Sequence, residues 1–256
     1  NDSWPDIYVS NDFNSPDFMY INNQDGTFKE VVNIATGHNS FYGMGADISD
    51  FNNDGNLDIF QLVMDAKDNR RKKANMSSMN PQLFRDVANA GFQIQYMHNC
   101  MQLNSGVFTD GVPHFSNVSR VTGTSSTDWS WGPLFADFDN DGYKDLYITN
   151  GTRREINNND FFNSLENSKL EKKDLLKKSK EIPSEKIDNF MYQNKGNLHF
   201  EQVNKKWGIE FKGFSNGVAY ADLDNDGDLE VITNNIDDYA SVFENTSSKT
   251  NNYLTI

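Results

Sequence analysis

The feature that most constrains the fold of this chain is a segment that occurs three times without gaps. Each copy has a glycine five residues before an acidic turn, and a short apolar run follows the turn. The copies are GADISDFNNDGNLDIF from Gly45, GPLFADFDNDGYKDLYI from Gly132 and GVAYADLDNDGDLEVIT from Gly217. Because a repeated segment usually marks one supersecondary unit used many times, the copies predict a repeat protein.

Each unit is predicted to form four short strands. The first two flank the acidic turn and cover 44–48 and 57–63, 134–136 and 146–149, and 218–221 and 229–233. An aromatic stretch such as 191–193 gives the third strand, and 198–203 gives the fourth after an Asn-Lys-Gly-Asn hairpin turn. Four-stranded units in tandem favour an all-β propeller, with a β-sandwich of hairpins as the alternative.

The same comparison predicts the organisation of the chain. A propeller segment would cover 1–250, and its units would be a partial blade 1–38, blades 39–120 and 121–210, and a partial blade 211–250. Because the chain begins and ends partway through a unit, we expect it to be a piece of a longer array of such repeats.

Two insertions, 64–98 and 151–189, interrupt the second and third units between their second and third strands, and both contain helical sequence. Since strand direction alternates, they should project from the end opposite the acidic turns, where long loops often serve recognition. The alternative is a solvated charged helix that only caps that end.

The acidic turns have the ligand pattern of a calcium loop. Oxygen side chains stand at positions 1, 3, 5 and 9 and glycine at position 6, while position 7 would offer its backbone carbonyl. We expect two to three Ca²⁺ ions rather than Mg²⁺, which keeps more water. The predicted ligands are Asp50, Asn52, Asp54, Asn56 and Asp58 in the first loop, Asp137, Asp139, Asp141, Tyr143 and Asp145 in the second loop, and Asp222, Asp224, Asp226, Asp228 and Glu230 in the third loop.

Two other interpretations of these turns are weaker. A single Asp/Asn-rich turn without an ion is common in proteins. Three such turns are a different case, because the carboxylates within each turn would repel one another without a cation. An EF-hand needs flanking helices and a carboxylate at position 12, where this chain has Gln61, Ile148 and Thr233.

Composition excludes several classes of protein. With 23 Lys and Arg against 37 Asp and Glu, the formal charge of −14 argues against nucleic-acid binding. The chain lacks an apolar run long enough to span a membrane. A single cysteine, Cys100, excludes an internal disulfide and a zinc cluster of cysteines, and we expect it to be a buried apolar residue. The histidines are His38, His98, His114 and His199, and they share no catalytic motif.

The repeats resemble the FG-GAP/VCBS repeats of integrin-α-like β-propellers, whose blades carry a DxDxDGxxD calcium loop between their first two strands. The phrases DWSWGPLFADFDNDGYKDLYITNG and FSNGVAYADLDNDGDLEVITNN are similar to bacterial relatives of cartilage acidic protein. In that family an ASPIC/UnbV domain follows the propeller, and 251–256 (NNYLTI) resembles its start. The chain departs from the pattern at Asn52 and Glu230, and Asp6 would be position 9 of a fourth loop.

The resemblance implies a surface or secreted protein. Calcium sites of modest affinity fill only where Ca²⁺ is plentiful, so we expect an extracellular or cell-surface location, outward-facing on the outer membrane if the source is a Gram-negative bacterium. The expected role is non-enzymatic: a recognition or scaffold module that binds a protein or glycan through the insertion end. The alternatives are a propeller enzyme acting on extracellular polysaccharide and a purely structural repeat.

Overall fold

The computed structural model describes residues 2–13, 15–75, 81–167 and 172–249. Within them the chain forms four antiparallel units whose strands pair in sequence order. These strands are β1 (Ile7–Val9), β2 (Phe18–Asn22) and β3 (Phe28–Glu30); β5 (Gly43–Ser49), β6 (Asp58–Asp65), β8 (Cys100–Thr109) and β9 (Val112–Asn117); β10 (Asp128–Ala136), β11 (Asp145–Asn150), β13 (Phe190–Asn194) and β14 (Phe200–Gln202); and β16 (Ser215–Ala221), β17 (Glu230–Asn235) and β18 (Ser241–Phe243).

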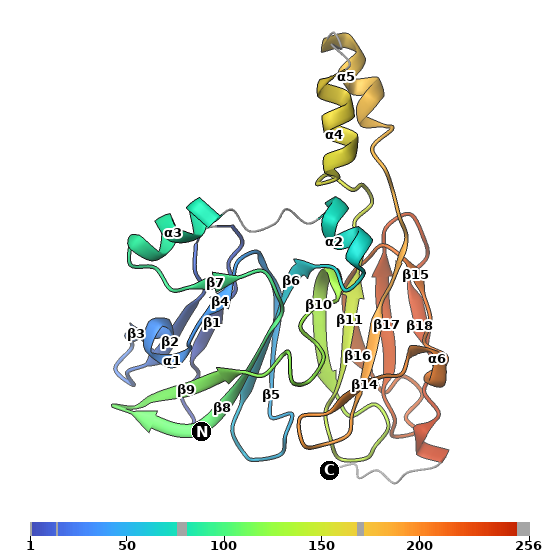
Figure 1. Cartoon of the computed structure of the whole chain (residues 1–256). Helices are drawn as coiled ribbons and strands as arrows, with labels where there is room; N and C mark the ends of the chain where they lie inside the picture. The colour runs from blue at the N-terminus through green and yellow to red at the C-terminus, as the bar shows by residue number, and fades with distance from the viewer. Residues whose placement is uncertain (1, 14, 76–80, 168–171, 250–256) are drawn as a thin grey trace.

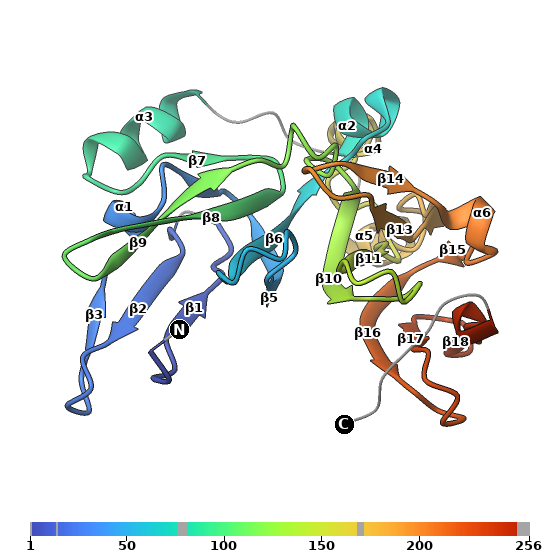
Figure 2. The ribbon, with the colours of Figure 1, turned by 90° about the horizontal axis from the view of Figure 1, so that it is seen from below.

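The units stand side by side in an open arc, with β5, β10 and β16 along its inner side and β9 and β14 on its outer side (Figure 2). This arrangement confirms the all-β, propeller-like fold, and the described residues do not form the face-to-face sandwich. The unit boundaries themselves stay predictions, and 251–256 lie outside the described residues.

The repeated glycine marks the place where neighbouring units come closest. In β5 the pairing register shifts between Gly43 and Ala46, and in β10 it shifts between Ser130 and Pro133. A Cβ on Gly45 would lie 2.2 Å from the backbone oxygen of Trp131 in the next unit. A glycine is therefore needed in β5 because the backbones of two inner strands approach each other there.

The core lies between neighbouring units. One apolar cluster joins the second and third units and is built on Phe60, Met101, Phe135, Leu146 and Tyr192, all buried. Similar clusters join the first unit to the second and the third to the fourth. Each unit therefore buries a face against its neighbour, which explains why one unit alone would not supply a core.

The second and third units are also joined directly. Strand β10 begins earlier than the sequence predicts, and its residues Asp128 and Trp129 pair with Asp65 and Met64 of β6. Trp129 is buried beside Met64, and Trp131 packs against the same cluster. These two tryptophans therefore lie between the second and third units.

The insertions project from the end of the strands opposite the acidic loops, as expected (Figure 1). The first contains two helices, α2 (Asn69–Asn75) and α3 (Pro81–Asn89). The second forms α4 (Asn159–Glu166) and α5 (Lys172–Ser179). The remaining elements are α1 (Val32–Ala35), β4 (Asn39–Ser40), β7 (Gln95–Tyr96), β12 (Ile187–Asp188), α6 (Asn204–Trp207), β15 (Lys212–Gly213) and the 3₁₀ turn Ser247–Lys249.

Candidate metal centre

The three acidic loops share one backbone shape. In each loop, positions 4 and 6 both have positive φ, which is the left-handed region where asparagine and glycine are tolerated best. The asparagines have φ of 60°, 55° and 62°, and the glycines 86°, 92° and 88°; they are Asn53, Asn140 and Asn225, and Gly55, Gly142 and Gly227. The asparagine at position 4 was overlooked in the sequence, although it occurs in every copy.

The aspartate at position 1 closes each loop. Its carboxylate accepts hydrogen bonds from the backbone N–H groups at positions 5 and 6. In the second loop these bonds run to Asp137 from Asp141 at 3.0 Å and from Gly142 at 2.9 Å. Asp50 and Asp222 accept the matching pairs in the other two loops. The loop is thus wrapped around this carboxylate.

The carboxylate at position 9 is buried at the start of the second strand of its unit. Asp145 is fully buried, and it accepts from the N–H of Phe138 at 3.1 Å and of Asn194 at 2.8 Å. Asp58 and Glu230 are buried and accept from the equivalent donors in their loops. This position therefore ties the loop to the third strand or to the residues that directly follow it.

Two loops bring three carboxylates to one point. One oxygen each from Asp137, Asp139 and Asp145 lies within 4.8 Å of the others, and the same holds for Asp222, Asp224 and Glu230. In the first loop Asn52 takes position 3, so a neutral amide stands where the other loops have a carboxylate. These oxygen clusters are acidic sites that could hold a metal ion.

The electrostatics of the loops suit a cation. Burial, reinforced by repulsion from Asp139 and Asp141, raises the pKa of Asp145 to about 8. Burial raises the pKa of Asp58 to about 6, and the charges of Asp54 and Asp50 add to that rise. A cation among these oxygens would stabilise the ionised form that burial disfavours.

The other predicted ligands lie within the same loops. The aspartate at position 5 accepts from the N–H at position 7, as Asp141 does from Tyr143 at 2.9 Å. Asp54 and Asp226 do the same with Asn56 and Asp228. The full ligand assignment stays a prediction.

Asp6 matches position 9 of a fourth loop. Its carboxylate accepts from the N–H of Asn22 at 2.9 Å. The side chain of Asn22 donates to the carbonyl of Pro5, directly before the aspartate, just as Asn104 donates to the carbonyl of Leu57.

Neighbouring loops are hydrogen-bonded to one another. The position-4 side chain of one loop donates to the position-6 carbonyl of the next: Asn53 to Gly142 at 2.9 Å, and Asn140 to Gly227 at 3.2 Å. The loops therefore form one continuous row rather than three separate turns.

Asparagines at the end of the third strand, or just after it, strengthen this row. Asn194 donates to the carbonyl of Lys144 in its own loop at 3.1 Å and to that of Phe51 in the preceding loop at 2.7 Å. Asn245 bridges the third and second loops in the same manner. Because each asparagine serves two loops, the position of one oxygen cluster constrains the next.

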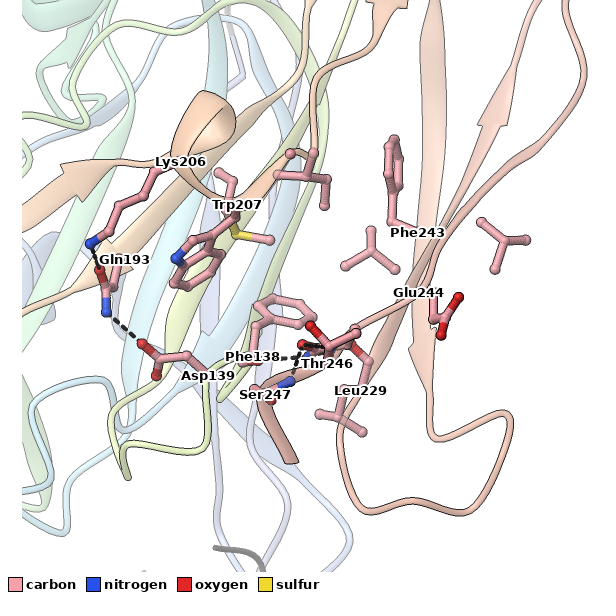
Figure 3. Close-up of a pocket in the computed structure, with 16 residues that line it drawn as sticks. Phe138, Asp139, Gln193, Lys206, Trp207, Leu229, Phe243, Glu244, Thr246 and Ser247 are labelled. Atoms are coloured by element: carbon pink, nitrogen blue, oxygen red, sulfur yellow. Dashed lines mark hydrogen bonds between the residues drawn. The ribbon is translucent and has the colours of Figure 1, made fainter. Parts of the chain in front are cut away.

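A groove of about 720 Å³ opens beside the second loop, between the third and fourth units (Figure 3). Trp207 and Phe243 supply apolar walls, and Gln193 donates a hydrogen bond to Asp139. The groove also contains Glu244, whose carboxylate does not point toward Asp139.

The single cysteine is buried, as predicted, and burial raises the pKa of the Cys100 thiol to about 12. The structure also brings His38 and His98 next to it. Their scattered sequence contexts gave no sign of this cluster.

The comparisons with known proteins agree with the repeats. The FG-GAP-like repeat family matches residues 1–60. Human cartilage acidic protein 1 is 24% identical over 255 residues, which cover 98% of this chain and 29% of that protein. Cartilage acidic protein 1 of Xenopus tropicalis is 25% identical, with 100% of this chain and 31% of that protein covered. The resemblance to FG-GAP-repeat proteins and to cartilage acidic protein is confirmed.

The chain spans less than a third of the length of these relatives. Among the described residues, every helix is too short or too polar to cross a membrane.

Proposed function

We propose that this chain is a calcium-stabilised, non-enzymatic recognition or scaffold module that works outside the cytoplasm. The observation that carries the proposal is the row of three loops with matching backbone shape, two of which bring three carboxylate oxygens within 4.8 Å of one another. Without a bound cation, the carboxylates gathered in each of these loops would repel one another and destabilise the folded state.

Calcium fits these loops better than the alternatives do. Its usual shell is about six to eight oxygens from carboxylates, amides, carbonyls and water, which matches a loop with several oxygen side chains. Asp137, Asp139 and Asp145 would hold the ion in the second loop, and Asp222, Asp224 and Glu230 in the third. Bound there, the ion would act structurally by neutralising the buried carboxylates.

The expected location follows from the calcium chemistry. Extracellular modules bind Ca²⁺ at about 10⁻⁴ to 10⁻³ M, concentrations that the cytoplasm does not supply. The relatives' name describes acidic proteins of cartilage, and this chain shares the acidic balance at −14. In a Gram-negative bacterium the corresponding place is the outward-facing surface of the outer membrane.

The insertion end is the proposed recognition surface because it is held in place. Arg71 of α2, only 6% exposed, pairs with Asp128 of β10 at 2.6 Å and with Glu155 of the second insertion at 2.7 Å. It also pairs with Glu185 at 3.0 Å. One buried guanidinium therefore joins both insertions to the propeller.

The arm formed by α4 and α5 extends beyond this anchor (Figure 1). Exposed apolar side chains lie on the insertions, including Ile156 at 55%, Leu176 at 71% and Phe92 at 51%. Apolar atoms displayed on an anchored projection suit contact with a protein or a glycan.

A binding experiment tests this proposal. The wild-type chain and a variant with 157–182 replaced by a short Gly-Ser linker would be compared on glycan arrays and against extracellular protein fractions in millimolar Ca²⁺. The variant keeps Glu155 and Glu185, so its anchor is intact. Binding lost with the arm, at unchanged melting temperature, supports recognition at this end; equal binding by both proteins contradicts it.

The groove beside the second loop is the observation that favours the enzyme alternative, because Trp207 could stack against a sugar ring. Glycoside hydrolysis needs two carboxyl groups that flank one bond, whereas Asp139 bonds to Gln193 and Glu244 points elsewhere. Release of reducing sugar from extracellular polysaccharides, abolished by Glu244→Gln, would establish the enzyme instead.

A further inference from the structure

A second cluster of ligand atoms lies away from the acidic loops and has different chemistry. The ligand atoms of His38, His98 and Cys100, two ring nitrogens and one sulfur, lie within 4.8 Å of one another. The sequence holds four histidines and one cysteine, so two of the four histidines meet the only thiol.

The backbone explains why these residues meet. Strand β4 pairs in parallel with β7, so that Asn39 lies opposite Gln95 and Ser40 opposite Tyr96. His38 directly precedes β4, and its carbonyl accepts from the side chain of Gln102 at 2.8 Å. The segment that enters the second unit is thereby held against the segment that leaves the first insertion.

Both imidazole rings are oriented by their neighbours. Nδ1 of His98 lies 3.0 Å from the carbonyl of Asn99, which leaves its Nε2 with a lone pair. A backbone carbonyl in this role is typical of histidines that ligate metals. The ring of Tyr96 stacks on His98 at 5.9 Å and meets His38 edge-on at 5.2 Å.

His38 is held as a neutral ring. The amide of Asn117 donates to its Nε2 at 2.9 Å, while the Asn117 oxygen accepts from the N–H groups of Met101 and Ser119. Because these two donors fix the amide, Nε2 carries a lone pair. An ion that takes this lone pair replaces the Asn117 hydrogen bond.

The burial of the cluster suits a bound ion. Cys100 is 1% exposed, whereas His38 and His98 are half-buried, so the thiol forms the floor and the imidazoles form an accessible rim. An ion could therefore enter from solvent and reach the sulfur.

The geometry points to a binding site for Zn²⁺, or a divalent ion of similar softness, at His38, His98 and Cys100. Imidazole and thiolate are ligands for zinc and not for Ca²⁺ or Mg²⁺. Three protein ligands would leave a fourth position for water. Coordination releases the thiol proton to solvent, and the ion clamps the end of the first insertion onto the second unit.

Cobalt is the probe for this site, because Co²⁺ bound to a thiolate has a near-ultraviolet charge-transfer band. The full chain would be titrated with Co²⁺ in millimolar Ca²⁺, which occupies the acidic loops. We expect the band to appear, to saturate at one ion per chain and to disappear when Zn²⁺ is added. Absence of the band overturns the proposal.

Variants assign the ligands. Cys100→Ser should abolish the band, and His38→Gln and His98→Gln should each weaken Co²⁺ binding at least about tenfold. His114→Gln is the matched control, since His114 lies on the β8–β9 hairpin and bonds to Thr109. A band that survives in Cys100→Ser, or that His114→Gln weakens equally, contradicts the assignment.

A measurement on the wild-type protein does not depend on the variants folding. Alkylation of Cys100 should slow at least about tenfold when Zn²⁺ is present, because the metal occupies the sulfur. An alkylation rate unchanged by Zn²⁺ overturns the proposal.

Discussion

At one end of the strands, the connections β5–β6, β10–β11 and β16–β17 are the same nine-residue turn used three times. At the other end, β6–β8 and β11–β13 are joined by insertions that differ in sequence and in helices. The first end repeats its side-chain contacts from unit to unit, whereas the second is held by ion pairs that occur once, among them those of buried Arg71. The end that carries the acidic loops thus keeps one sequence pattern and one geometry in three units, while the insertions at the other end differ in both.

The largest effect should come from breaking the buried Arg71 anchor of the insertion end. Arg71→Met leaves Asp128 and Glu155 buried without their guanidinium, and it should lower the free energy of unfolding by about 3–5 kcal/mol. Arg70→Met is the control, since solvent screens the exposed Arg70–Glu185 pair and its loss should change stability much less. Denaturant titration checks both; similar losses for the two variants would show that Arg71 is no special anchor.

The next effect concerns the repeated glycine. Gly45→Ala places a methyl group 2.2 Å from the Trp131 carbonyl oxygen and should cost about 1–3 kcal/mol by overpacking. Gly217→Ala occupies the same repeat position, but its Cβ would meet Asn234 at an ordinary 3.8 Å. It should change stability by less than about 1 kcal/mol. Thermal unfolding that gave equal losses would refute the close approach of the inner strands.

The acidic loops should make the stability of the calcium-free protein depend on pH. The folded pKa is about 8 for Asp145 and about 6 for Asp58, above the ~3.9 of an unfolded aspartate. Between those values the folded state binds protons that the unfolded state has released. Stability should therefore fall as pH rises from about 4 to about 8.

Calcium should flatten this dependence, because the ion favours the ionised carboxylates. Asp145→Asn should also reduce it, since the largest contributor no longer titrates. Melting temperatures measured across this pH range with chelator and with Ca²⁺ check both statements, and a stability that rises with pH in chelator contradicts them.

The smallest expected effect is a difference in calcium affinity among the three acidic loops. Asn52→Asp gives the first loop the carboxylate that the others have at position 3, and ligand charge tunes calcium affinity. We expect about tenfold tighter binding at that loop, equivalent to about 1.4 kcal/mol. Asp224→Asn makes the reverse change in the third loop and should weaken its site. If calorimetric titration shows neither change in affinity, Asn52 does not weaken calcium binding at the first loop.

The sequence predicted the repeated parts of the molecule because their signals are local. Alternating apolar residues and a glycine at position 6 specify strands and turn directly, and the end from which the insertions project follows from strand direction. The bonds that link one loop to the next, such as Asn53 to Gly142, could not be predicted, because their partners lie far apart along the chain.

Two other features also depend on contacts between residues that lie far apart along the chain. Helix α2 lacks a strong apolar stripe, and it is fixed by Arg71 pairing with residues more than fifty positions away. His38 meets Cys100 only because a short parallel pairing of β4 with β7 crosses the first insertion. Non-repeated contacts of this kind leave no spacing pattern to detect.

Calcium binding by the acidic loops is tested most directly by thermal unfolding in Ca²⁺, in Mg²⁺ and in excess chelator, with metal analysis of the purified protein. A ligand at a hundred times its Kd stabilises the folded state by about 2.7 kcal/mol per site. If the loops bind calcium, the melting temperature should rise strongly and selectively in Ca²⁺, with about two to three bound ions per chain. Equal melting temperatures in all three conditions, without bound calcium, would contradict calcium binding by the loops.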